Sequence, residues 1–397
     1  MSASLTLVLL VAAAYLAARV VVDWLGRRFL VVSGAEYLLL GILLGPRVAG
    51  LLTHDVVQSL APVTTLAMGW VGATVGSRLD VRHLVGVPGM AFRLAFVESA
   101  LTFAVVGAIE MVAIAALYDI ALLDAALPAA ALGAIAVASS SAGVELAARG
   151  LKRESAVVTQ LGVSTLVNAL CAVVSFGVLA AVWHRTVLVH DRAMTSTEWV
   201  AITLGIGVAA GALFHLFVED EHDADRLFVS LVGGVILVSG AATYLGLSPV
   251  LAALVFGAML VNTSRNRIDL RAALERVERP YTLVLLLFAG AAWRPSERAW
   301  VAPVLLYLLV RAVAKVGGAR LASRANGVLP VLGAHWGRAL VGQGGLAIAI
   351  ALSYVYQDGG TLPYLVFTCA IASALLTDVF SARMARAVAA GGESGSR

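Results

Sequence analysis

Two basic side chains lie deep inside one apolar stretch, where a charge can bind an ion or hold a proton. Arg311 and Lys315 are four residues apart, so on a helix they share one face. At about 1.5 Å per residue, their position within the stretch 299–321 places them near the middle of a membrane. An isolated cation is unfavourable there, so we expect partners. For Arg311 the alternatives are the carbonyls of an unwound segment or snorkelling to the membrane surface.

Few acidic residues lie in apolar stretches and could pair with these cations. Glu98 is the best candidate for an ion carrier or a counter-ion, although pairing with nearby Arg93 is an alternative. Glu145 can instead pair with Arg149, four residues further on. The interior acids considered are Glu98, Glu110, Glu145 and Asp378.

Two segments rich in small residues interrupt apolar stretches in opposite halves of the chain. One, residues 139–143, contains Ser139, Ser140 and Ser141, and the other, residues 342–345, contains Gln343 between glycines. Such residues permit close helix packing, but they also permit unwinding that exposes carbonyls and hydroxyls to an ion. The pair predicts an inverted repeat with a transport site at the membrane midplane, as in a secondary transporter.

The composition requires these segments to belong to an all-α polytopic membrane protein. Of 397 residues, 60% are hydrophobic and only 13% are charged, too few for a soluble domain. We predict one transmembrane domain, residues 1–386, and a disordered polar tail, residues 387–397. The domain contains about thirteen spans, with approximate limits 3–25, 34–52, 57–77, 88–117, 126–148, 155–183, 199–218, 227–245, 248–263, 280–293, 299–321, 337–356 and 361–382.

The distribution of positive charge predicts the orientation. With the N-terminus outside and the C-terminus in the cytoplasm, most Lys and Arg residues fall in inner loops. We expect a bacterial plasma membrane and contact with the lipid bilayer. The net charge of +4 does not indicate a nucleic-acid partner. The outer loops hold only Arg47, Arg185, Arg192, Arg294 and Arg298.

Four motifs occur in order along almost the whole chain: GAEYLLLGILLGP (34–46), YLGLSPVLAALVFGAMLVN (244–262), RAVAKVGGARLASR (311–324) and GQGGLAIAIAL (342–352). Together they resemble the monovalent cation:proton antiporter superfamily, which includes sodium/proton exchangers and glutathione-gated potassium efflux transporters. The resemblance implies thirteen helices, a homodimer with a mobile core domain, and fifth and twelfth helices that cross at unwound centres. It also implies an ion-carrying aspartate on the sixth helix and a basic partner on the eleventh, here Lys315.

The sequence departs from this family at the carrier itself. Asn168 matches the residue that precedes the aspartate, but Ala169 stands where the aspartate is expected. No Asp or Glu lies between Glu154 and Asp191, so a shifted alignment does not restore it. Because alanine binds no proton, exchange requires a carboxylate elsewhere, for example Glu98.

Three functions follow as hypotheses. The first is Na⁺ or K⁺:proton antiport by alternating access with a displaced carboxylate. The second is a transporter-fold regulatory or sensing protein that no longer exchanges ions, suggested by Ala169. The third is anion transport, suggested by Arg311 and Lys315 without their carboxylate. Metal-ligand clusters, phosphate loops and catalytic triads are missing from the sequence, so we expect neither an enzyme nor a cofactor.

Overall fold

The computed structural model describes residues 34–141, 144–145, 156–184, 188–189, 192–218, 223–295, 300–333 and 336–394. Their regular structure is helical except for a short antiparallel hairpin, in which Leu188 pairs with Ala193. The first predicted span, residues 3–25, lies outside the described residues.

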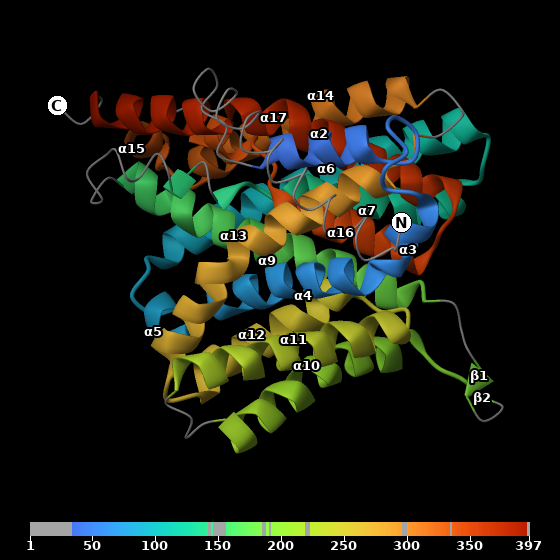
Figure 1. Cartoon of the computed structure of the whole chain (residues 1–397). Coiled ribbons are helices and arrows are strands. Elements are labelled where there is room, and N and C mark those ends of the chain that lie inside the picture. The colour runs from blue at the N-terminus through green and yellow to red at the C-terminus, as the bar shows by residue number, and fades with distance from the viewer. Residues whose placement is uncertain are drawn as a thin grey trace.

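Each of the remaining predicted spans contains a helix, as Figure 1 shows. The elements are α2 (Ala35–Leu44), α3 (His54–Ser59), α4 (Ala61–Ser77), α5 (Val81–Leu84), α6 (Gly89–Tyr118), α7 (Leu122–Val137), α9 (Ala156–Val182), β1 (Leu188–Val189), β2 (Arg192–Ala193), α10 (Ser196–Val218), α11 (Ala224–Tyr244), α12 (Pro249–Thr263), α13 (Arg267–Ala292), α14 (Val301–Ala325), α15 (Leu329–Leu332), η1 (Trp336–Leu340), α16 (Gly345–Gln357) and α17 (Thr361–Ser394).

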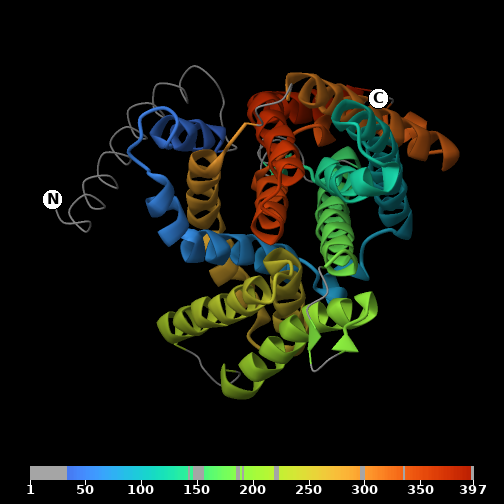
Figure 2. The same ribbon diagram turned by 90° about the vertical axis from the view of Figure 1, so that its right-hand side faces the viewer.

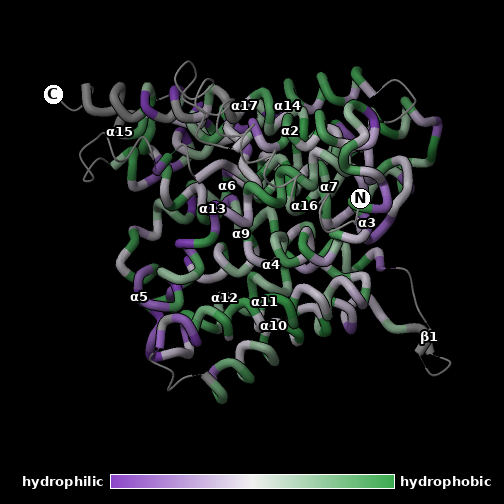
Figure 3. The backbone as a smooth tube through the Cα atoms, viewed as in Figure 1, coloured by the Kyte–Doolittle hydropathy of each residue, from purple (hydrophilic) through white to green (hydrophobic). Residues whose placement is uncertain are grey.

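The helices lie side by side, and their polar residues gather at the ends. In Figure 3 most residues in the middle of the molecule are hydrophobic, whereas hydrophilic residues are concentrated around α5 at one end and around α3 at the other. Five of the described helices are long and apolar enough to cross a membrane, namely α6, α9, α10, α11 and α14. The protein is therefore a polytopic membrane protein of the predicted all-α class.

The helices form two bundles. The core bundle contains α6, α7, α9, α14, α16 and α17, and the scaffold bundle contains α2, α4 and α10 to α13. Figure 2 shows α10, α11 and α12 on one side of the molecule and α6, α14 and α17 on the other. Trp70 and Phe256 are fully buried inside the scaffold bundle, together with Leu231.

Within the scaffold, α4 and α12 touch through their backbones. A Cβ atom at Gly76 would lie 2.0 Å from the carbonyl oxygen of Leu254, and one at Gly257 would lie 2.1 Å from that of Ala73. Small residues permit this approach, which is typical of helices packed in a membrane. The contact fixes α4, whose C-terminal end borders the site described below.

The core bundle contains the two predicted interruptions. After α7 ends at Val137, residues 138–140 are non-helical, and Ser141 is helical again. The short helix η1 ends at Leu340, and residues 341–344 are non-helical before α16 begins. Each break therefore separates two helical segments within one membrane span.

The structure differs from the sequence prediction at three places. Helix α13 begins at Arg267 rather than near residue 280, because its first half is charged and hydropathy detects only the apolar half. Helix α17 continues to Ser394 through most of the predicted disordered tail, and residues 395–397 lie outside the described residues. The hairpin between α9 and α10 was not predicted.

Candidate functional site

The two interrupted segments cross each other inside the core bundle. The amide of Ser140 donates to the carbonyl of Gly342 at 2.9 Å, and the hydroxyl of Ser139 donates to the carbonyl of Leu340 at 2.9 Å. Ser139 and Ser140 are buried, and Gln343 has no exposed area. The predicted meeting of the two segments is therefore confirmed for their described parts, whereas residues 142–143 lie outside them.

The end of α7 is held by side chains from other helices. A helix leaves its last carbonyls without backbone partners, and buried carbonyls need them. Consecutive carbonyls here accept bonds from buried side chains: Ile135 from Gln343 Nε2 at 2.7 Å, Ala136 from Arg311 Nε at 3.2 Å, Val137 from Lys315 Nζ at 2.6 Å and Ala138 from Arg311 Nη2 at 3.0 Å.

Arg311 joins the two breaks. Besides its bonds to the end of α7, it donates through Nη1 to the carbonyl of Val341 in the other interrupted segment. A guanidinium presents several donors in a fixed plane, so it can bridge carbonyls from two segments at once. The expectation that Arg311 bonds to the carbonyls of an unwound segment is confirmed.

Lys315 has the carboxylate partner that its burial requires. Its Nζ lies 3.0 Å from Oε1 of Glu98, and both side chains are 0% exposed. The same oxygen accepts a bond from Thr102 at 3.1 Å, whereas Oε2 of Glu98 has no hydrogen-bond partner among the described residues. The alternative pairing of Glu98 with Arg93 is wrong, because Arg93 is exposed and Glu98 faces α14.

Asn168 connects this ion pair to the crossing. Its Nδ2 donates to the hydroxyl of Ser139 at 3.1 Å, and its Oδ1 accepts from Ser99 at 2.6 Å, next to Glu98 on α6. Asn168 is fully buried, but the following residue, Ala169, reaches a cavity. A single residue step on α9 therefore separates the sealed polar network from solvent-accessible space.

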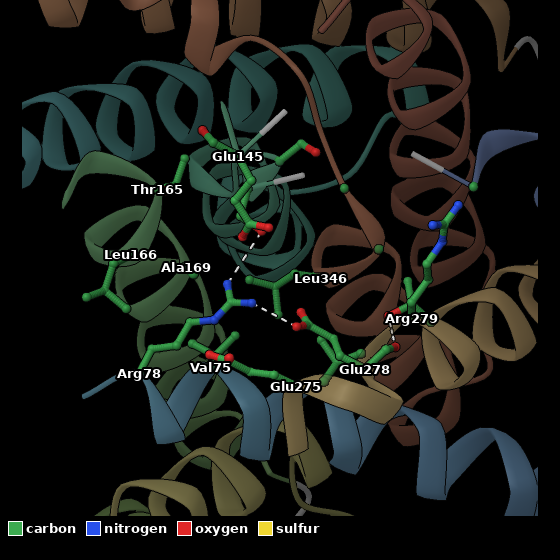
Figure 4. Close-up of a pocket in the computed structure, with 18 of the residues that line it drawn as sticks. Val75, Arg78, Glu145, Thr165, Leu166, Ala169, Glu275, Glu278, Arg279 and Leu346 are labelled. Carbon is green, nitrogen blue, oxygen red and sulfur yellow. Dashed lines mark hydrogen bonds and ion pairs between the residues drawn. The ribbon is translucent and has the colours of Figure 1, made fainter. Parts of the chain in front are cut away.

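The cavity has a volume of about 360 Å³ and lies between the two bundles. Its inner wall includes Ser139, Ser140, Ser141, Thr165 and Ala169. The rest of its lining includes five charged residues, namely Arg78, Glu145, Glu275, Glu278 and Arg279 (Figure 4).

Arg78 holds this charged region together. Its Nη2 lies 2.8 Å from Oε2 of Glu278, and its Nη1 donates to the hydroxyl of Ser141 at 3.4 Å. The side chains of Arg78 and Glu278 are 22% and 29% exposed, so the cavity reaches solvent beside the C-terminal end of α4. The cavity leads from there to the crossing. Glu98, Lys315, Arg311 and Gln343 lie outside its lining.

All eight predicted site residues belong to one connected region, but in two layers. Ser139, Ser140 and Ser141 line the cavity, and behind them lie Asn168, Glu98, Lys315, Arg311 and Gln343. Sequence reasoning missed Thr102 and Tyr307, although each lies one helical turn from a predicted residue, Glu98 and Arg311 respectively. Among the described residues no group of His, Cys, Asp and Glu could hold a metal ion.

The two layers predict different reactivity toward a membrane-impermeant, charged thiol reagent. In a background without Cys171 and Cys369, Thr165→Cys is expected to react, because Thr165 lines the cavity. Thr102→Cys is expected to stay unlabelled, because Thr102 is fully buried and thiol reaction requires access. Mass spectrometry of the labelled protein measures both. Equal labelling of the two variants would contradict the layered arrangement.

Comparison with known proteins identifies the fold. Neither a protein-family model nor a curated protein matches the chain. Two solved structures of the sodium proton antiporter MjNhaP1 from Methanocaldococcus jannaschii do match. One, at pH 8, has a TM-score of 0.68 and 14% identity and covers 98% of this chain and 96% of that one. The other, an electron-microscopy map, has a TM-score of 0.69 and 14% identity, with 98% of each chain covered. The chain thus has the fold of a sodium/proton antiporter, with its two crossing interrupted helices.

Proposed function

We propose that this protein is a secondary transporter that exchanges a monovalent cation, Na⁺ or K⁺, for protons by alternating access. The observation that carries the proposal is the Glu98–Lys315 ion pair, sealed beside the crossing of two interrupted helices. Glu98 takes the role that an aspartate at position 169 would have in the family that the sequence resembles. The similarity to a sodium proton antiporter structure supports the same function.

The chemistry of the pair suits competition between a proton and a metal ion. A carboxylate of Glu98 can be neutralised by the Lys315 ammonium, by a proton or by a bound cation. Oxygen ligands near the pair are Oε2 of Glu98, which has no hydrogen-bond partner among the described residues, the hydroxyl of Thr102 and the carbonyl of Val137. A cation bound there would repel the Lys315 ammonium and favour loss of its proton, so one positive charge replaces another.

We further propose that the cavity opens to the cytoplasm, with the N-terminus outside. The positive residues near the cavity, including those in the first half of α13, support this orientation. A homodimer in a bacterial plasma membrane, as the resemblance implies, completes the proposal.

Purified protein in liposomes that contain a pH-sensitive dye tests the exchange. Adding Na⁺ or K⁺ outside is expected to make the interior alkaline, because entering cations drive protons out. In Glu98→Gln the signal is expected to fall to that of empty liposomes. Asp124→Asn, which removes an exposed carboxylate at the start of α7, is the matched control and is expected to behave like wild type. A wild-type protein that gives no ion-driven signal at any pH would reject the proposal.

A second candidate is a transporter-fold protein that regulates or senses without exchanging ions, which Ala169 favours. It predicts ion binding without proton movement in the same liposomes. The anion alternative started from basic side chains without a carboxylate. In the structure Lys315 is paired with Glu98 and Arg311 donates to three carbonyls, so this alternative loses its motivation.

A further inference from the structure

A second carboxyl group lies buried in the core bundle, and the exchange site does not use it. Glu110 is on α6, twelve residues beyond Glu98, which corresponds to about 18 Å along a helix. Its side chain is 0% exposed, and neither carboxyl oxygen has a hydrogen-bond partner among the described residues. Glu98, in contrast, has both Lys315 and Thr102 as partners.

Among the described residues, no cation interacts with Glu110. In the part of the chain that the structure describes, the ionisable groups that interact with it are the Tyr307 hydroxyl on α14 and the Cys369 thiol on α17, both uncharged acids. Helix α7, which also packs on α6, carries only Asp124 as a charged residue, and Asp124 is exposed. On α9 the ionisable group is Cys171, which lies beside Ser99 and Glu98 instead.

An ionised carboxylate in this environment would be strongly unfavourable. A buried charge without a partner or a hydrogen bond is avoided by neutralisation. A carboxylate does so by taking up one proton, which forms a single O–H bond and leaves no net charge. The geometry therefore requires a proton on Glu110.

Tyr307, which interacts electrostatically with Glu110, is hydrogen-bonded to the crossing. The hydroxyl of Tyr307 accepts a bond from Gln343 Nε2 at 3.3 Å, and Gln343 also bonds to the end of α7. In the other direction, Tyr118 ends α6 two turns beyond Glu110, and its buried hydroxyl has no hydrogen-bond partner in the described part of the chain. Glu110 thus lies toward the C-terminal end of α6, whereas the cavity reaches solvent beside Arg78, which precedes the start of α6 in the chain.

We propose that Glu110 is a second proton-binding site, occupied in this state and located on the closed half of the transport path. When the Tyr118 end of α6 opens, the carboxylate of Glu110 takes up a proton from water there and forms an O–H bond. When that bond breaks again, the proton returns to water. The role in transport rests on the exchange proposed above. The proton occupancy does not.

Infrared difference spectroscopy, which compares wild type with each variant, tests whether Glu110 holds a proton. In an ester-free detergent at neutral pH, wild type is expected to show the carbonyl stretch of a protonated carboxylic acid, with a downshift in D₂O. The band is expected to vanish in Glu110→Gln and to persist in Glu98→Gln. A wild-type spectrum without such a band, or a band unchanged in Glu110→Gln, overturns the proposal. If Glu110→Gln does not fold, Glu110→Met removes the same band with an apolar side chain of similar size.

The pH profile of exchange tests the transport role. Glu110→Gln cannot lose or gain the proton, so its exchange is expected to continue with a shifted half-maximal pH. A merely structural carboxyl would leave the profile of folded protein unchanged, and a profile that superimposes on wild type overturns this part. If wild type exchanges no ions, the proposed function fails, and the infrared band alone decides whether Glu110 holds a proton.

Discussion

Lys315→Met is expected to lower the free energy of unfolding by about 3–5 kcal/mol, since removing one partner of a buried ion pair leaves an uncompensated charge. The remaining Glu98 would keep only its bond from Thr102, and the carbonyl of Val137 would lose its shorter bond, the one from Lys315, and keep the 3.5 Å bond from Ser139. Because a lone carboxylate can escape by taking up a proton, the deficit is expected to be smaller at acidic pH and larger at alkaline pH.

The double variant Glu98→Gln/Lys315→Met tests whether the two side chains interact. It removes both charges, so most of the lost stability is expected to return, as for buried ion pairs replaced by uncharged side chains. Unfolding by sodium dodecyl sulfate in mixed micelles measures the free energy of unfolding of wild type, Glu98→Gln, Lys315→Met and the double variant. Arg93→Gln, an exposed change on the same helix, is the control and is expected to stay within about 0.5 kcal/mol of wild type. Strictly additive single effects would show that the two side chains do not interact.

The ion pair also shows what the sequence could predict. The burial of Lys315 and its need for a partner follow from its place in an apolar stretch, and both are confirmed. The choice of Glu98 over the alternatives depends on α6 packing against α14, a contact between segments about 200 residues apart in the chain. Helical periodicity alone places Thr102 beside Glu98, so that residue could have been found.

The cap on α7 could not be predicted in the same way. The serines indicate where the helix weakens, and the break covers residues 138–140. The carbonyls that the break frees are bonded by Gln343 and by Arg311 and Lys315, which come from two later elements. Local sequence determines that such carbonyls exist, but only the tertiary arrangement determines which donors reach them.

Hydropathy likewise predicted the apolar spans more accurately than the full lengths of the helices. It finds long apolar stretches, so α6, α9 and α14 begin and end close to their predicted limits. The charged first half of α13 is invisible to it, although this half supplies Glu275, Glu278 and Arg279 to the cavity. The charged lining of the cavity was therefore missed, whereas Glu98, Arg311 and Lys315 behind it were named from the sequence, and their role in transport stays a prediction.

Ala169→Asp is expected to create a cation site at the inner wall of the cavity. Ala169 lines the cavity beside Ser139, Ser140 and Thr165, so a carboxylate there would meet an entering ion among hydroxyl oxygens. A cation could then bind without first separating Glu98 from Lys315. One favourable charge pair of about 1.4 kcal/mol would lower the half-maximal Na⁺ or K⁺ concentration roughly tenfold.

The liposome assay of proton exchange measures this change, with Ala169→Asn as the control of similar size and no charge. If wild type exchanges ions, the aspartate variant is expected to saturate at lower cation concentration and the asparagine variant is not. If wild type is silent and the aspartate variant exchanges, the chain is a transporter that lacks only its carrier, and Glu98 does not replace it. An aspartate variant that matches wild type in every respect would mean that position 169 does not face the ion path, because a charge exposed to passing cations must change their affinity.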